Sequence, residues 1–214
     1  MSPTLSSKIV NSLYNNLSKS IPSPRTELFY KNNFELLVAV ILSAQATDKI
    51  VNEVTPSLFQ KNPDPQSFIN CGENNLRILI KRIGLAPTKA KNIIKTCIYI
   101  NEKHNGQVPN SRKELEKLPG VGRKTANVVL NEAFGEATIA VDTHVFRVAN
   151  RTGLAKGTSV LETEKQLLKI TPMKWKKKAH HYLLLHGRYV CKAKNFDCTE
   201  CSINKECQFP NKTT

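Results

Sequence analysis

The chain has 214 residues, with 32 Lys plus Arg against 17 Asp plus Glu and a formal net charge of +15. This length allows one or two domains with a buried core, and the cationic excess favours an acidic partner such as nucleic acid. The continuous apolar stretch at residues 34–44 is too short to span a bilayer, which excludes a membrane protein and predicts a soluble one.

The first 26 residues contain no Asp or Glu and many Ser, a composition shared with organelle transit peptides. Leu5, Ile9, Leu13 and Leu17 repeat every four residues, however, which favours a short amphipathic helix. No apolar core followed by a small-residue cleavage site is present, so secretion is not expected.

The hydrophobic periodicity and the positions of Gly and Pro predict an all-α chain. After the N-terminal helix, helices are expected at 34–44, 76–83, 89–102, 112–117, 123–134, 143–152, 160–170 and 173–190. Residues 137–141 are apolar and β-branched, which indicates a short extended link.

Two segments are the expected domain boundaries, the Pro-rich residues 22–24 and the link at 136–142. We therefore expect a middle helical domain at 26–136. The second domain then joins residues 1–25 to 137–214.

Gly120 and Gly122 flank one apolar residue between two expected helices. Glycine permits positive φ and a close approach of the backbone, and the free N–H groups that begin the second helix suit a phosphate oxygen. The alternative is an ordinary turn between helices. The pattern extends from Leu115 to Val129, which favours the phosphate site.

Lys124 follows directly in the first turn of that second helix, and Asp142 precedes the helix expected at 143–152. An amine there can attack a sugar carbon and form an imine, but Lys124 can equally be one of many lysines that contact phosphate. Asp142 can be a simple N-cap, or its carboxylate can also stabilise positive charge on a sugar.

Four cysteines lie within the last segment, at positions 191, 198, 201 and 207. Four thiolates can hold one zinc ion or one [4Fe–4S] cluster. Only Cys198 and Cys201 have the spacing of a zinc knuckle, and the wider outer spacings suit a larger centre without deciding the matter.

These motifs together resemble the endonuclease III family of helix-hairpin-helix DNA glycosylases. The resemblance rests on residues 34–48, the hairpin at 118–131, the aspartate segment at 139–150 and the cysteine spacing, and it covers nearly the whole chain. It implies an all-α fold with a six-helix central domain and a C-terminal [4Fe–4S] loop domain that includes the N-terminal helix.

The resemblance also implies a reaction. Lys124 matches the Schiff-base nucleophile and Asp142 the essential carboxylate of a bifunctional glycosylase and abasic-site lyase that removes oxidised pyrimidines. The cysteine pattern matches the family's [4Fe–4S] ligands Cys191, Cys198, Cys201 and Cys207.

The expected partner is double-stranded DNA, bound by a monomer in the cytoplasm of a bacterium, at the nucleoid. Gln45 and Leu85 match the residues that fill the gap left by an extruded nucleotide. Other DNA contacts are expected from Gly120, Gly122, His144, Lys192 and Lys194. Lys89 and Lys91 can contact phosphate or simply be solvated at the surface.

Two other functions remain open at this stage. A monofunctional glycosylase, like the adenine-specific relatives, would lack the lysine at position 124 and would carry an extra C-terminal domain. A non-catalytic helix-hairpin-helix module would need neither Lys124 with Asp142 nor residues that fill a gap in the duplex.

Overall fold

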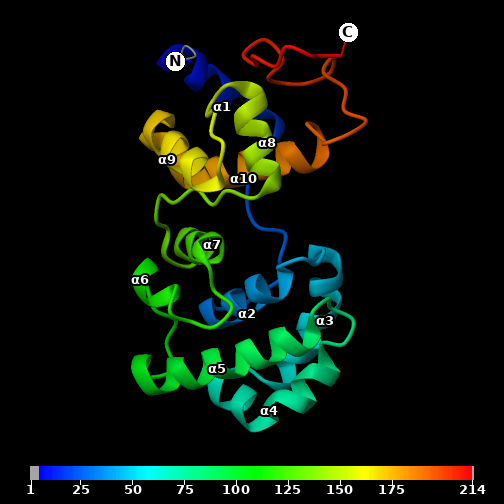
Figure 1. Ribbon diagram of the computed structural model, residues 1–214, viewed down its shortest axis with the longest axis vertical. Coiled ribbons are helices and arrows are strands. Elements are labelled where there is room, and N and C mark those ends of the chain that lie inside the picture. Colours follow the sequence, from blue (N-terminus) through cyan, green and yellow to red (C-terminus); the bar gives the residue numbers. More distant parts are fainter. Residues whose placement is uncertain (1–4, 214) are drawn as a thin grey trace. The chain divides into compact units, whose positions relative to one another are not determined.

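The computed structural model describes residues 5–213, and every regular element in that range is a helix (Figure 1). The chain forms two compact units. The central unit is Glu27–Gly135, and the terminal unit joins Met1–Thr26 to Glu136–Thr214. A search of the described helices finds none with the length and hydropathy needed to cross a membrane.

The central unit is built around one helix whose residues are buried from Phe34 to Leu42. A helix that is apolar on all sides requires neighbours on all sides, and α3, α5 and α7 pack against it. The six helices of this unit are α2 (Asn33–Ser43), α3 (Asp48–Lys61), α4 (Pro65–Leu79), α5 (Ala86–His104), α6 (Arg112–Leu115) and α7 (Arg123–Phe134).

The start of α4 was not expected from the sequence. Asp64 caps it by accepting a hydrogen bond from the Ser67 N–H at 2.8 Å, and Pro65 occupies its first turn. Gly72, at φ 74° and ψ 162°, then kinks the helix, so the apolar periodicity becomes regular only after the kink.

Helix α3 also went unpredicted. Its buried face carries Val51, Val54 and Leu58 at helical spacing, but Pro56 lies inside the helix and reads as a breaker in the sequence. The Thr47 side chain caps its start by accepting from the Ile50 N–H at 3.3 Å. Packing of the apolar face against α2 therefore outweighs the single hydrogen bond lost at proline.

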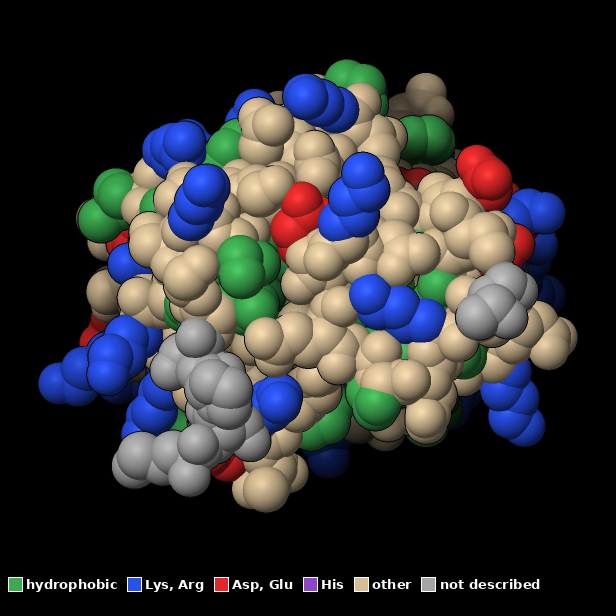
Figure 2. All heavy atoms as spheres, turned by 90° about the horizontal axis from the view of Figure 1, so that it is seen from above, with side chains coloured by type: hydrophobic (Ala, Val, Ile, Leu, Met, Phe, Trp, Pro, Cys, Tyr) green, Lys and Arg blue, Asp and Glu red, His purple; other side chains and the backbone are tan. Residues whose placement is uncertain are grey.

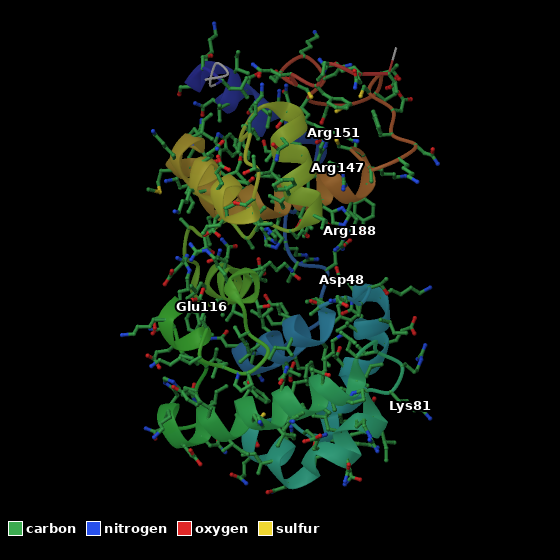
Figure 3. The ribbon with its side chains drawn as sticks, in the orientation of Figure 1. Asp48, Lys81, Glu116, Arg147, Arg151 and Arg188 are labelled. Carbon is green, nitrogen blue, oxygen red and sulfur yellow. The ribbon has the colours of Figure 1, made fainter. Side chains whose placement is uncertain are left out.

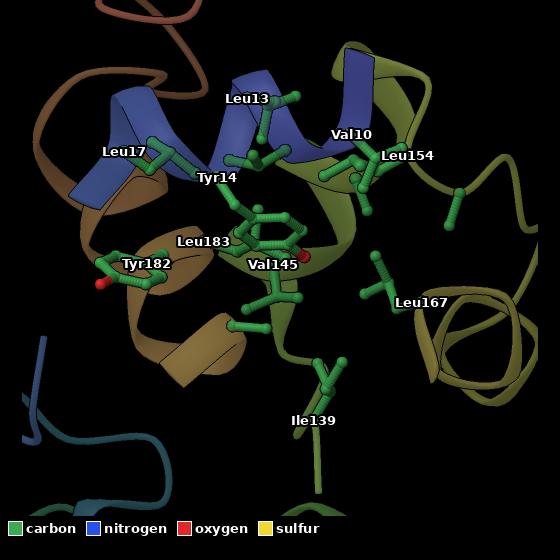
Figure 4. Close-up of a cluster of buried hydrophobic side chains, with 14 of the residues drawn as sticks. Val10, Leu13, Tyr14, Leu17, Ile139, Val145, Leu154, Leu167, Tyr182 and Leu183 are labelled. Carbon is green, nitrogen blue, oxygen red and sulfur yellow. The ribbon is translucent and has the colours of Figure 1, made fainter. Parts of the chain in front are cut away.

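The terminal unit contains α1 (Ser7–Ser20), α8 (Thr143–Thr152), α9 (Val160–Ile170) and α10 (Met173–Tyr189). Its core gathers residues from all four helices, among them Leu13, Tyr14, Val145, Leu167 and Leu183 (Figure 4). The N-terminal stretch is thus a helix, as predicted, but its buried face is Val10, Leu13, Tyr14 and Leu17, whereas Leu5 precedes the helix and Ile9 is exposed.

Tyr14 is fully buried in this core, with its hydroxyl 3.0 Å from the Thr171 hydroxyl. Burial raises the pKa of Tyr14 above its usual value. Its ring stacks on Trp175 at a centroid distance of 6.1 Å. Helix α1 is therefore held to α10 by ring packing and to the end of α9 by a polar contact.

The predicted bounds of α7, α8 and α9 agree with the structure, and α10 ends one residue earlier than expected. Each of these helices ends or begins at a clear signal. Gly135 and Gly153 adopt left-handed conformations after α7 and α8, and Ser159 caps α9. Residues 137–141 form no helix or strand, in agreement with the link predicted there.

Candidate active site

The turn between α6 and α7 has the geometry of a tight helical hairpin. Gly120 adopts φ +82°, and a Cβ there would lie 3.1 Å from Asn92 Nδ2 on α5. The Thr96 hydroxyl, also on α5, donates to the Pro119 carbonyl at 3.0 Å. Leu118 and Val121 are buried beneath the turn. The positive φ therefore favours glycine at position 120, and a larger residue there would also have to displace Asn92.

Gly122 lacks the positive φ for which glycine was expected there. Its φ of −93° and ψ of −179° are extended values open to any residue, so it does not need the conformational freedom of glycine. A Cβ added there meets nothing within 4 Å. Gly122 is the N-cap of α7 with no side-chain cap, which leaves the positive end of that helix open to a ligand oxygen.

Lys124 is exposed in the first turn of α7, while the next two residues, Thr125 and Ala126, face the core. The Lys124 side chain is therefore on the solvent side of the helix, two residues after the open backbone at Gly122. Thr125 and Ala126 anchor the turn that carries it.

Asp142 is the N-cap of α8, as its position before the helix predicts. Its Oδ1 accepts a hydrogen bond from the Val145 N–H at 2.8 Å, and the side chain is half-buried. The cap commits one carboxylate oxygen and fixes the orientation of the other. Lys124 belongs to the central unit and Asp142 to the terminal unit.

His144 takes part in a network that ties α8 to the end of α10. Its Nδ1 lies 3.2 Å from Arg147 Nη2. Arg147 also donates to the carbonyls of Gly187 at 2.7 Å and Cys191 at 3.0 Å. A Cβ at Gly187 would approach the His144 Cβ to 3.0 Å, so α8 and α10 are in close contact here.

Gln45 and Leu85 are both exposed and both left-handed, with φ values of 53° and 62°. Non-glycine residues rarely adopt this conformation, and it is enriched at functional sites. The two lie near each other, because a Cβ on Gly84 would sit 3.6 Å from the Gln45 carbonyl oxygen. The structure therefore gathers the two residues predicted to enter the duplex.

Lys89 does not lie at the surface, contrary to both interpretations offered for it. Its side chain is buried, and Nζ donates to the Leu42 carbonyl at 2.8 Å. Burial lowers the pKa of Lys89 below its ordinary value. Lys91 is exposed, as expected.

The four C-terminal cysteines line one hollow, together with His186, Phe196 and Phe209 among others. All four thiols are half-buried. Burial raises the pKa of Cys201 and Cys207 and lowers that of His186 to about 4. Across the described range, no three His, Cys, Asp or Glu side chains are arranged to hold a single metal ion.

Nitrogen groups approach the sulfur atoms around this hollow. Arg151 donates to Cys191 Sγ at 3.4 Å, and the Phe209 N–H donates to Cys207 Sγ at 3.5 Å. His186 Nε2 lies 3.7 Å from Cys201 Sγ. The Arg151 and Phe209 donors stabilise thiolates, so the four-thiol set and these neighbours fit a thiolate-bound group.

Arg147 and Arg151 are functional candidates that the sequence analysis missed (Figure 3). The Arg151 guanidinium contacts the rings of both Phe196 and Phe209, at 4.3 and 4.8 Å from their centroids. It also donates to the carbonyl of Lys192 at 2.7 Å. Arg147 and Arg151 are four residues apart and so share one face of α8, and this spacing is the sequence signal that could have identified them.

Lys192 and Lys194 are exposed on the loop that Arg151 holds. The face of the molecule in Figure 2 likewise shows Lys and Arg side chains outnumbering acidic ones. This distribution agrees with the net charge of +15 and suits an anionic partner.

Comparison with known proteins identifies the family. Residues 38–173 match the model of the HhH-GPD superfamily base excision DNA repair proteins. The chain is 55% identical to endonuclease III of Rickettsia felis over 207 residues, covering 97% of each protein. The chain belongs to the endonuclease III family. It is also 52% identical to the endonuclease III of Escherichia coli K12 over 196 residues, with 92% and 93% of the two chains covered.

Solved structures confirm the endonuclease III fold. A trapped endonuclease III–DNA covalent intermediate matches with a TM-score of 0.90 and 46% identity, covering 96% of this chain and 97% of the other. A thermostable thymine-DNA glycosylase, at 21% identity and a TM-score of 0.83, shows the same fold over 94% and 96% of the chains. The predicted all-α helix-hairpin-helix fold and the family resemblance are both confirmed.

Proposed function

We propose that this protein is a bifunctional DNA glycosylase and abasic-site lyase that removes oxidised pyrimidines from double-stranded DNA. The observation that carries the proposal is the exposed Lys124 side chain in the first turn of α7, two residues after the open backbone at Gly122. Family membership supports it, and the endonuclease III of similar structure has been trapped as a covalent intermediate with DNA.

The chemistry assigns Lys124 the role of nucleophile. The neutral amine attacks C1′ of the deoxyribose, the new C–N bond forms, and the base departs with the electrons of the glycosidic bond and takes up a proton. The sugar ring opens to an imine. Loss of a C2′ proton then expels the 3′ phosphate by β-elimination, which cuts the strand and leaves an unsaturated sugar imine that water hydrolyses.

Asp142 complements this nucleophile. Its Oδ1 is occupied by the cap of α8, so we assign Oδ2 to the sugar. There the negative charge stabilises the oxocarbenium-like transition state, and the carboxylate accepts protons as the amine reacts.

The remaining contacts position the DNA. We assign the backbone at Gly120 and Gly122 to a phosphate, because the open end of α7 favours an anion. The left-handed residues Gln45 and Leu85 would fill the gap left when the damaged nucleotide rotates out of the stack.

Three further residues complete the proposed DNA contacts. We assign His144, Lys192 and Lys194 to phosphates flanking the lesion, since two are exposed cations and the third lies on the first turn of α8.

We further propose that Cys191, Cys198, Cys201 and Cys207 bind one [4Fe–4S] cluster. With all iron atoms held by protein thiolates, the cluster would serve as a cross-link that folds the loop carrying Lys192 and Lys194. Arg151 and the Phe209 N–H would donate to its thiolates.

The proposal extends to the organisation of the protein. We propose domains at 26–136 and at 1–25 with 137–214, close to the two compact units. The substrate implies a place with the chromosome, in the bacterial cytoplasm at the nucleoid. We propose that the protein acts as a monomer.

A panel of duplexes tests this function. One carries an oxidised pyrimidine, a second carries adenine opposite an oxidised guanine, and a third is undamaged. The proposal predicts base release and a strand nick only in the first. Adenine release without a nick would indicate the monofunctional alternative, and tight binding without any product would indicate a non-catalytic module.

A further inference from the structure

Lys89 is a buried basic residue for which the proposed chemistry has no use. It lies in the first turn of α5, and only 5% of its surface is exposed. Lysine is rarely buried to this degree unless its amine has a specific partner. The partner here is the Leu42 carbonyl, 2.8 Å away and 47 residues earlier in the chain.

The Leu42 carbonyl belongs to the last turn of α2, where four carbonyls lack partners within the helix. Two of the four accept from backbone N–H groups three residues later, and two accept from side chains. The Ser43 hydroxyl donates to the Val40 carbonyl, the Ala44 N–H to Ile41, the Ala46 N–H to Ser43, and Lys89 Nζ to Leu42. Lys89 therefore completes the C-terminal cap of α2 from a distant helix, and its charge suits the negative end of that helix.

The cap directly precedes Gln45, whose φ of 53° turns the chain sharply away from α2. The same lysine is tied to the second left-handed residue, because its backbone N–H donates to the Leu85 carbonyl at 3.0 Å. Lys89 thus bonds both to the end of α2 before Gln45 and to Leu85. These two segments are close together, because a Cβ on Gly84 would lie 3.6 Å from the Gln45 carbonyl oxygen.

We propose that Lys89 is a positioning residue that holds Gln45 and Leu85 together in the geometry needed to enter the duplex. This inference rests on the proposed function, since it assumes that the two exposed side chains fill the space of an extruded nucleotide. Lys89 itself does not touch DNA. Its amine binds the end of α2, and its backbone N–H binds the Leu85 carbonyl, so Lys89 keeps Gln45 and Leu85 in a fixed arrangement.

The critical variant is Lys89→Met, which keeps the length and apolar stem of the side chain but removes the donor. Lys95→Met is the matched control, because Lys95 is an exposed lysine farther along the same helix. Base excision from a duplex with one oxidised pyrimidine is measured under single-turnover conditions. Loss of a hydrogen bond from a charged donor predicts a rate about tenfold lower for Lys89→Met, and an unchanged rate for Lys95→Met.

A double-mutant cycle separates positioning from a general loss of stability. If Lys89 acts through the wedge residues, its removal should cost no more than about twofold once Leu85→Ala is already present. An equal loss in both backgrounds, or no loss in the wild-type background, would overturn the inference. Should Lys89→Met fail to fold, Lys89→Gln, whose shorter neutral side chain removes the charged donor, is taken through the same cycle with the same criteria.

The inference fails separately from the proposed function. If the wild-type protein excises the base and nicks the strand, but the effects of the Lys89 and Leu85 variants are additive, only the role of Lys89 is refuted. If the wild-type protein has no activity on the damaged duplex, the proposed function itself is refuted.

Discussion

Replacing Asp142 separates its two roles, because Asn and Ala remove different parts of the side chain. The Oδ1 atom caps α8 through the Val145 N–H at 2.8 Å. Asn retains an acceptor oxygen and ranks with Asp as an N-cap, whereas Ala removes the cap at a typical cost of about 1 kcal/mol. For a chain of this size that cost corresponds to a Tm lower by about 2–4 °C.

Catalysis should respond differently. Neither Asn nor Ala can supply a negative charge to the sugar or accept a proton, so both variants should lose base excision by about 10²- to 10⁴-fold. Thermal unfolding followed by circular dichroism gives the first quantity, and single-turnover base release gives the second.

The pattern across the two variants decides the interpretation. Asp142→Asn should unfold within about 2 °C of wild type and yet be nearly inactive. An Asn variant with the wild-type rate would refute the catalytic role. An Ala variant as stable as wild type would show that the cap contributes nothing.

Three other predictions follow from particular contacts. Gly187→Ala places a Cβ 3.0 Å from both His144 Cβ and Val148 Cγ2, and overpacking should cost about 1–3 kcal/mol in a denaturant titration; unchanged stability would contradict the close contact of α8 and α10. Hydrogen bonds from the Thr158 N–H and hydroxyl hold the pKa of Glu162 below its usual value, so this contact stabilises the fold above the ordinary glutamate pKa and is lost as pH falls through the lowered pKa. Glu162→Gln should therefore reduce the loss of folding stability in that acid range, and an acid unfolding profile identical to wild type would argue against the contact. Cys198→Ser should lower the iron and acid-labile sulfide that co-purify with the protein, and a wild-type protein carrying zinc instead would contradict the cluster.

The sequence was most informative where a local signal matched the packing. Helices α7 and α8 begin and end where glycine and Asp142 predict, because caps act within a few residues. The start of α4 was missed because Gly72 interrupts its periodicity, and α3 because its buried face outweighs Pro56.

The site shows the same division between local and distant determinants. The helical setting of Lys124 and the N-cap position of Asp142 could be predicted from the sequence, and the structure gives each a local setting that suits the role proposed for it. The burial of Lys89 depends on a carbonyl 47 residues away, which no local pattern contains. The contacts of Arg151 with the cysteine loop likewise join segments more than 40 residues apart.

The most direct test of the central claim is borohydride trapping with duplex DNA that contains a preformed abasic site. Reduction of the imine would link protein and DNA through Lys124 Nζ, detected as a slower band on a denaturing gel and located by mass spectrometry of the digested adduct. The account predicts a stable adduct for wild type and none for Lys124→Ala, with Lys95→Ala trapped as efficiently as wild type. An adduct of undiminished yield in Lys124→Ala, or one mapped to another residue, would contradict it.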